Sequence, residues 1–271
     1  MKIQRVLTGL IGFPIVAAIL IFGNIYLIDI LFAIVAILSI HEYFTAFKNK
    51  AKPVTWIGYI CCGLIAFVHA IPSQYILTVI GVIIPIILLI LFLQVIITNM
   101  KTTVADIAIT FFGISYIAIF TLFIPLLMAQ NNGKLLIWYI IFSAWGTDTF
   151  AYIVGMKFGK HKFSSISPKK SIEGCIGGTT AAVLIVLAYT FILNTYFGTN
   201  INYIYIAIVG LILSLIGQIG DLSASCIKRY VEIKDFSNLF PGHGGMLDRI
   251  DSVIFIAPFA YFLLMLVTIY F

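Results

Sequence analysis

Residues 75–97 read YILTVIGVIIPIILLILFLQVII and contain no charged side chain. Apolar residues cover every face of this segment, whereas a surface helix of a soluble protein has one apolar stripe and one polar face. A helix crosses the hydrocarbon core of a bilayer with about 20 apolar residues. A membrane barrel strand would be shorter and would alternate apolar with polar residues. The segment therefore predicts a membrane-spanning helix.

The composition extends this prediction to the whole chain of 271 residues, which is 62% hydrophobic and 10% charged. Soluble domains average about 25% charged residues, so soluble globular, disordered and collagen-like classes are excluded. We expect an all-α polytopic integral membrane protein in the lipid bilayer. Polar breaks divide the chain into about nine expected transmembrane helices, at residues 6–22, 25–47, 54–71, 75–97, 104–129, 135–156, 174–193, 203–220 and 252–270.

The basic residues indicate the orientation of these spans. With the N-terminus inside, only Lys134 of the 16 Lys and Arg residues would face outside, as the positive-inside rule requires. The expected topology is N-in/C-out, in a bacterial cytoplasmic (inner) membrane with the active site facing the cytoplasm. The net charge of +6 is thereby explained without a nucleic-acid partner.

The acidic residues divide the chain unequally. Residues 1–132 hold only Asp29, Glu42 and Asp106, and the other seven of the ten acids follow. We therefore expect N-terminal transmembrane helices in residues 1–132 and a catalytic half in residues 133–271, with cytoplasmic loops at 157–173 and 221–251. His41 and Glu42 are expected to mark the membrane interface.

The second of these loops carries carboxylates at both of its membrane ends. Asp221 ends one expected span, and Asp248 and Asp251 begin the next. Carboxylates that converge repel one another unless a cation joins them, and Mg²⁺ is characteristically bound by one or two carboxylates together with substrate phosphates. We infer a Mg²⁺-phosphate site. The same loop supplies cationic donors for phosphate oxygens, at Lys228, Arg229, Lys234 and Arg249.

A glycine-rich turn at residues 241–245 lies within this loop. Backbone N–H groups beside Gly244 and Gly245 can approach an anion closely. His243 is either a general acid or a solvated histidine in the turn. The alternative for each residue taken singly is an ordinary basic loop with a flexible turn, which does not account for the combination.

The first loop and the span before it add weaker candidates. Lys169, Lys170 and Ser171 precede a predicted helix N-terminus, which suits phosphate, although the positive-inside rule explains the lysines equally well. Asp148 lies within an apolar run, where a carboxylate costs about 2.5–3.5 kcal/mol on insertion scales. It is expected to face a polar cavity or a partner; the alternative is a hydrogen-bonded packing residue.

The motif Ser225-x-Ile-Lys-Arg, followed by Lys234-Asp-x-Ser and by residues 240–251, FPGHGGMLDRID, resembles the signature of the phosphatidate cytidylyltransferase (CDP-diacylglycerol synthase) family. The match has no departure within it. Residues 148–178 resemble the family too, with Ser171 where threonine is more usual.

The resemblance implies transfer of CMP from CTP to phosphatidic acid, giving CDP-diacylglycerol and pyrophosphate, with Mg²⁺ required. It implies Asp221 and Asp248 as metal ligands, with Asp251 as a further ligand or the residue that orients Arg249. Lys228, Arg229, Lys234 and Arg249 would bind phosphates, and Lys169 and Lys170 would close over the nucleotide. Substrate-binding roles are also expected for Ser171, Ser225, His243, Gly244, Gly245 and Asp148.

A second, monovalent cation and a homodimer are left open by the sequence. Two other classes of protein remain as alternatives. A secondary transporter would share an intramembrane Asp and basic loops, but it should show repeats or paired broken helices. Another membrane lipid-phosphate transferase or kinase would share Mg²⁺ and the bilayer.

Overall fold

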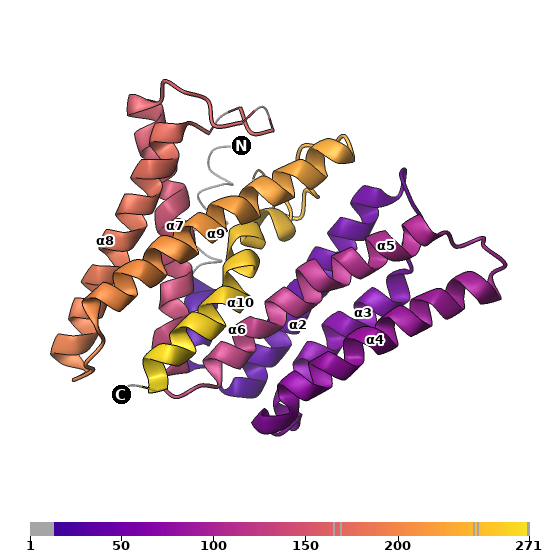
Figure 1. Cartoon of the computed structure of the whole chain (residues 1–271), viewed down its shortest axis with the longest axis horizontal. Coiled ribbons are helices and arrows are strands. Elements are labelled where there is room, and N and C mark those ends of the chain that lie inside the picture. The colour runs from indigo at the N-terminus through magenta and orange to yellow at the C-terminus, as the bar shows by residue number, and fades with distance from the viewer. Residues whose placement is uncertain (1–13, 165, 169, 241, 243, 270–271) are drawn as a thin grey trace. The chain divides into compact units, whose positions relative to one another are not determined.

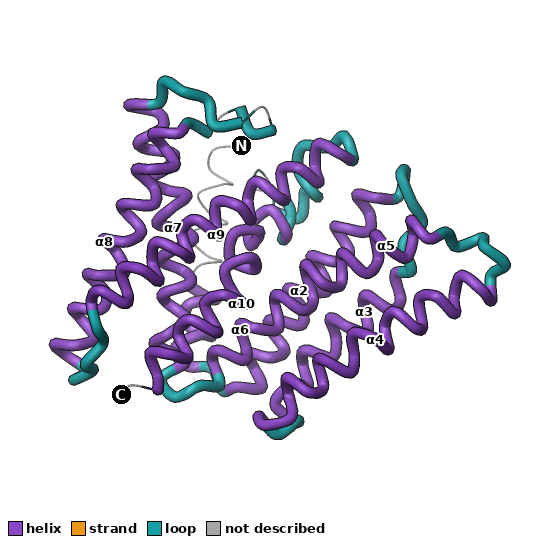
Figure 2. Tube along the Cα trace, viewed as in Figure 1, coloured by secondary structure: helices purple, strands orange, loops and turns teal. Residues whose placement is uncertain are grey.

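The computed structural model describes residues 14–269, apart from 165, 169, 241 and 243. Its regular secondary structure is helical throughout these residues (Figure 2). Extended backbone pairs only at two isolated bridges in the described chain, Lys162 with Ser171 and Phe240 with Gly244. The predicted all-α class is confirmed.

Six helices in the described part of the chain are long and apolar enough to cross a membrane. They are Ile25–Phe47, Gln74–Ile97, Val104–Met128, Ile172–Tyr196, Tyr203–Tyr230 and Leu247–Val267. Thr55–Ala70 is a shorter apolar helix, and residues 14–22 are also helical. The chain is therefore a polytopic membrane protein, while nine spans and the N-in/C-out orientation stay predictions.

The chain folds as two compact units. The N-terminal unit comprises the residues up to Pro125 together with Tyr230–Arg249, and the C-terminal unit comprises Leu126–Arg229 and Ile250–Phe271. The first holds α2 (Ile25–Phe47), α3 (Thr55–Leu64), η1 (Ile65–Ala70), α4 (Ser73–Ile97), α5 (Val104–Gly113) and η2 (Ile114–Ile119), and α6 (Phe120–Met128) leads out of it. The second holds α7 (Gly133–Phe158), α8 (Ile172–Tyr196), α9 (Tyr203–Tyr230) and most of α10 (Leu247–Ile269).

In the N-terminal unit, polar side chains begin the helices where the sequence breaks. The Asn24 side chain accepts a hydrogen bond from the Leu27 N–H at 2.8 Å, which caps α2 and makes the short Gly23-Asn24 break a helix boundary. Thr103 and Asp106 form a capping box at the start of α5. Inside the unit, α2 packs against α3 and η1, and His69 hydrogen-bonds Asp29 at 2.8 Å. The Asn24 cap and the Asp29 contact hold the N-terminal part of α2, and Glu42 lies toward the other end of the same helix.

In the C-terminal unit, α7 and α8 lie side by side (Figure 1). Glycines allow their backbones to approach. A Cβ on Gly174 would lie 2.6 Å from the Ala151 carbonyl oxygen, and one on Gly178 would lie 2.6 Å from that of Thr147. A buried hydroxyl contact then joins α7 to α9, from Thr147 to Ser214 at 2.7 Å.

The helix α9 continues well past the predicted end of its span at residue 220. It reaches Tyr230, so Asp221, Ser225 and Lys228 lie on a helix and the non-helical segment is 231–246. The polar residues 221–230 lower the hydropathy but do not break a helix, because no glycine or proline occurs among them. The other loop runs between the end of α7 at Phe158 and the start of α8 at Ile172.

Candidate active site

The C-terminal unit places an ion pair between its long loop and α9. The Lys170 ammonium group pairs with Asp221 Oδ2, and both side chains are mostly buried, at 18% and 27% exposure. Lys170 is held because its neighbour Ser171 is the N-cap of α8, accepting a hydrogen bond from the Gly174 N–H at 3.1 Å. Two predicted site residues are thus in contact, and Ser171 has a structural role as well.

Asp251 of the same unit lies near Asp221, and Asp148 lies near Asp251. Asp251, on α10, is 7% exposed and interacts electrostatically with Asp221, Asp148 and Lys228. Asp148 Oδ2 lies 3.4 Å from the Ser252 hydroxyl, and the Ser252 N–H donates to Asp251 Oδ1 at 2.8 Å. The structure thus brings together the predicted residues Asp148, Asp221, Asp251, Lys170 and Lys228, and it adds Ser252.

Whether these side chains fit a metal ion depends on their number and their chemistry. In the described residues, no group of three or more His, Cys, Asp or Glu side chains is placed so that it could hold a metal ion by itself. The donors are nevertheless carboxylate and hydroxyl oxygens, which Mg²⁺ prefers. Because Mg²⁺ usually takes only one or two carboxylates and completes its shell with water and substrate phosphates, this donor set fits magnesium bound together with phosphate groups.

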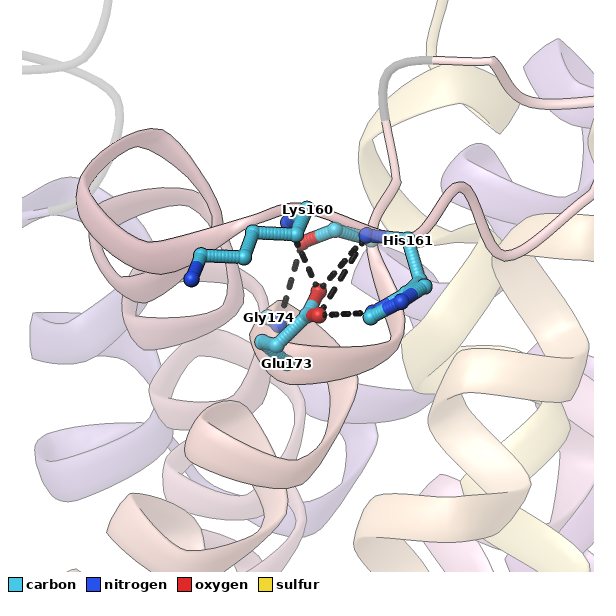
Figure 3. Close-up of polar contacts among 5 residues, drawn as sticks. Lys160, His161, Glu173 and Gly174 are labelled. Carbon is cyan, nitrogen blue, oxygen red and sulfur yellow. Dashed lines mark hydrogen bonds and ion pairs between the residues drawn. The ribbon is translucent and has the colours of Figure 1, made fainter.

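Glu173, in the first turn of α8, holds the part of the long loop that directly follows α7 (Figure 3). The carboxylate accepts hydrogen bonds from the Lys160 N–H at 3.1 Å and the His161 N–H at 3.3 Å, and it lies 2.6 Å from His161 Nδ1. The loop closes further because the Phe163 N–H donates to the Lys170 carbonyl oxygen at 2.9 Å. Glu173 also lies in the first turn of α8, where a carboxylate stabilises the helix N-terminus. Lys169 lies outside the described residues.

In the N-terminal unit, Asp248 organises the glycine-rich turn. Its Oδ2 accepts hydrogen bonds from the Phe236 N–H at 2.8 Å and the Gly245 N–H at 2.9 Å. Gly244 has a positive φ of 83°, and a Cβ there would lie 2.8 Å from Asp248 Oδ2. In this structure the Gly245 N–H donates to Asp248, and the expected substrate-binding role of Gly245 stays a prediction. His243 lies outside the described residues.

Glu42 is a site residue that the sequence did not indicate. It lies near the end of α2, is 4% exposed, and accepts hydrogen bonds from the Ser237 hydroxyl and the Met246 and Leu247 N–H groups. Its carboxylate is buried against the signature segment, which we define as residues 234–251, and the expectation that Glu42 marks the membrane interface stays a prediction. One signal could have found it: it is one of three acids in the first 132 residues.

A second contact joins Lys50, which follows α2, to Glu232, which follows α9. Lys50 Nζ lies 2.9 Å from Glu232 Oε1. The hydrogen bond and the charge of Lys50 lower the pKa of Glu232 below its ordinary value, and Glu232 raises the pKa of Lys50. Both side chains are exposed, so the pair adds little stability.

The remaining predicted residues carry charge or hydroxyl groups at the surface. Arg229 and Lys228 are in the last turn of α9, and Arg229, Lys234 and Arg249 are exposed while Ser225 is half-buried. The two predicted metal ligands belong to different units, Asp221 to the C-terminal and Asp248 to the N-terminal one. Their joint role stays a prediction.

Known proteins match this chain over nearly its whole length. The model of the cytidylyltransferase family matches residues 3–267. The phosphatidate cytidylyltransferase of Bacillus subtilis (strain 168) is 33% identical over 270 residues, covering 97% of each chain. The phosphatidate cytidylyltransferases of Staphylococcus haemolyticus (strain JCSC1435) and Staphylococcus aureus (strain COL) are 38% and 39% identical over 160 residues, covering 59% of each chain.

Proposed function

Because the chain belongs to the cytidylyltransferase family, we propose that it transfers the cytidylyl group of CTP to phosphatidate, a step of phospholipid biosynthesis. The products are CDP-diacylglycerol and pyrophosphate. The observation that carries this proposal is the match to the Bacillus subtilis phosphatidate cytidylyltransferase across 97% of both chains. The chain is accordingly a membrane-embedded nucleotidyltransferase.

In this reaction a phosphate oxygen of phosphatidate attacks the α-phosphorus of CTP. The new bond joins that oxygen to the α-phosphorus, and the bond from the α-phosphorus to the bridging oxygen of the β-phosphate breaks, releasing pyrophosphate. A phosphate monoester has a second pKa near 6, so the attacking oxygen is largely ionised at neutral pH. The enzyme therefore needs to position two anions and neutralise their charge more than it needs a strong base.

The C-terminal unit has the groups for that task. Lys170 and Lys228 supply ammonium groups beside the carboxylates, and ammonium groups stabilise phosphate oxygens through charge-assisted hydrogen bonds. We assign Mg²⁺ to the carboxylates around Asp221, where bound magnesium would neutralise the triphosphate and the leaving pyrophosphate. Ser171 caps α8 directly after Lys170, and Glu173 hydrogen-bonds the start of the same loop. The position of Lys170 is therefore set before substrate binds.

The N-terminal unit supplies the signature turn. Asp248 stays in place through two backbone N–H groups, and Arg249 follows it with an exposed side chain. We assign Asp248 a second carboxylate role toward Mg²⁺ and Arg249 a phosphate contact. These two hydrogen bonds fix the direction of the carboxylate, which suits both metal binding and ordering of the turn.

The reaction also needs the loops on the side that contains CTP. We place the segments 159–171 and 231–246 at the cytoplasmic face of a bacterial inner membrane, with phosphatidate reaching the site from the inner leaflet. The basic residues support this orientation through the positive-inside rule. A tag or cysteine placed after the last residue should react from the outside of intact cells. A C-terminus that is protected until the cells are opened would contradict the nine-span topology.

The assay that tests the activity uses purified protein, phosphatidate, Mg²⁺ and CTP, followed by organic extraction. Label from the α-phosphate of CTP should enter the lipid phase, and label from the γ-phosphate should stay in water as pyrophosphate. Transfer of γ-label to lipid would identify a lipid kinase instead. Substrate uptake into vesicles with neither label in lipid would support a transporter and overturn the proposal.

A further inference from the structure

A buried carboxylate on α2, that of Glu42, makes three hydrogen bonds to the signature segment. Glu42 Oε1 accepts hydrogen bonds from the Ser237 hydroxyl at 2.6 Å and the Met246 N–H at 2.8 Å, and Oε2 accepts one from the Leu247 N–H at 2.9 Å. All of these residues belong to the N-terminal unit. The three bonds span sequence separations of 195 to 205 residues.

The chemistry of this contact explains why a charge is buried there. The N-terminus of a helix leaves its first N–H groups without intrahelical partners, and a carboxylate satisfies and stabilises them. Leu247 begins α10, so Glu42 caps α10 from another part of the chain. A buried carboxylate is costly unless its oxygens are hydrogen-bonded, and here each oxygen accepts at least one hydrogen bond.

Glu42 and Asp248 accept hydrogen bonds from different backbone N–H groups of the turn. The Gly245 N–H donates to Asp248 Oδ2, and the next two, from Met246 and Leu247, donate to Glu42. A Cβ added at Gly245 would overlap the Glu42 carboxylate. The absence of a side chain at residue 245 is therefore required by the close approach of Glu42.

We propose that Glu42 is a positioning residue for the cytidylyl transfer: it fixes the turn at residues 245–247 and thereby the direction of the Asp248 carboxylate. The inference rests on the proposed function, because it assigns Asp248 to the reaction. It places one determinant of activity on α2, in the half of the chain that the sequence left without a site. Partners that orient a ligand-bearing side chain typically change activity about 10–100-fold when removed.

The chain offers a closely matched control in Asp106. This carboxylate is 5% exposed and also accepts two backbone N–H groups and one hydroxyl, from Lys52, Thr103 and the Thr103 side chain. It caps α5 in the same unit, and within the described residues its side-chain hydrogen bonds go to Lys52 and Thr103, not to the signature segment. Loss of its charge reports on the general cost of neutralising a buried capping carboxylate.

The test compares Glu42→Gln with Asp106→Asn in the full chain, measuring thermal stability, kcat, and the KM values for CTP and phosphatidate. Glu42→Gln should lower kcat about 10–100-fold in protein that remains folded. Asp106→Asn should lower the melting temperature while the kcat of the folded enzyme stays close to wild type. A Glu42→Gln enzyme that loses stability and keeps the wild-type kcat would overturn the inference.

Two further measurements separate the possible failures. If Glu42→Gln does not fold, Ser237→Ala removes one hydrogen bond and leaves the carboxylate in place. It should lower kcat with stability retained, and a wild-type kcat would overturn the inference. Hydrogen exchange at residues 245–247 should accelerate in Glu42→Gln whether or not the wild type transfers CMP. Inactive wild-type protein would refute the proposed function, whereas unchanged exchange would refute the positioning role.

Discussion

The ammonium group of Lys170 is paired with the carboxylate of Asp221 in the C-terminal unit. Lys170 directly precedes the cap of α8, while Asp221 lies on α9. Each partner is a group that phosphate chemistry needs, a cation for the nucleotide and a carboxylate for magnesium. Arrival of a magnesium-bound triphosphate would therefore exchange this pair for two new ones without leaving either charge uncompensated.

Lys170→Met should reduce kcat/KM for CTP by about 10–100-fold, because a hydrogen bond to a charged group is worth roughly 1.5–3 kcal/mol. The control is Lys162→Met in the same loop, where the side chain is exposed and the contribution to the fold is a backbone bridge to Ser171. Steady-state kinetics with CTP varied would measure both. Equal effects of the two variants would show that only the net charge of the loop matters.

Asp248→Asn should remain folded and lose activity by roughly 10²-fold or more, the scale found when one electrostatic group of a site is removed. The amide retains an oxygen that can accept from the Phe236 and Gly245 N–H groups, so the turn keeps its hydrogen bonds while the charge is lost. Circular dichroism and the α-label assay would check this. Near wild-type turnover would exclude a metal role for Asp248.

Gly245→Ala should destabilise the signature turn and lower activity, because its Cβ would overlap the carboxylate of Glu42. The matched control is Gly81→Ala on α4, where an added Cβ meets nothing within 4 Å. That change should stabilise the protein slightly, by about 0.5–1 kcal/mol, since alanine favours a helix more than glycine does. Thermal unfolding in detergent would measure the change in stability of each variant. Similar changes in the two variants would contradict the close contact at residue 245.

The ion pair of Lys50 and Glu232 predicts a pH dependence. The pKa of Glu232 is lowered below its ordinary 4.5 in the folded protein, so its stabilising contribution is present above that value and is lost as the pH falls through the lower, folded pKa. Wild type should therefore melt slightly above Glu232→Gln at pH 7, with the difference vanishing in strong acid. It should also shrink in 1 M salt, which screens exposed charges. A difference independent of pH and salt would show that the ion pair is not its source.

The helices were largely predictable, because a bilayer selects long apolar runs. The predicted span at 25–47 coincides with α2, and the span at 104–129 agrees with Val104–Met128. The end of α9 was not predictable by this route. Hydropathy reports where a helix leaves an apolar environment, and α9 continues through polar residues to Tyr230 because none of them is a glycine or proline.

The site was predictable only where its residues are near one another in the sequence. Asp248, Gly244 and Gly245 lie in one short motif, so their association in the turn could be predicted from the sequence. Glu42 meets the same turn across about 200 residues, and neither spacing nor periodicity contains that pairing. The Asp148 contact to Ser252 has the same origin, since α7 and α10 are joined only by tertiary packing.

The glycine contacts between α7 and α8 have a consequence for the lipid substrate. Where Gly174 and Gly178 bring the two backbones to within the space of a methyl group, no acyl chain can enter between these helices. A phosphatidate tail that stays in the hydrocarbon must therefore reach the site by a path that does not pass between α7 and α8. The contact between these two helices limits the directions from which a diacylglycerol chain can approach.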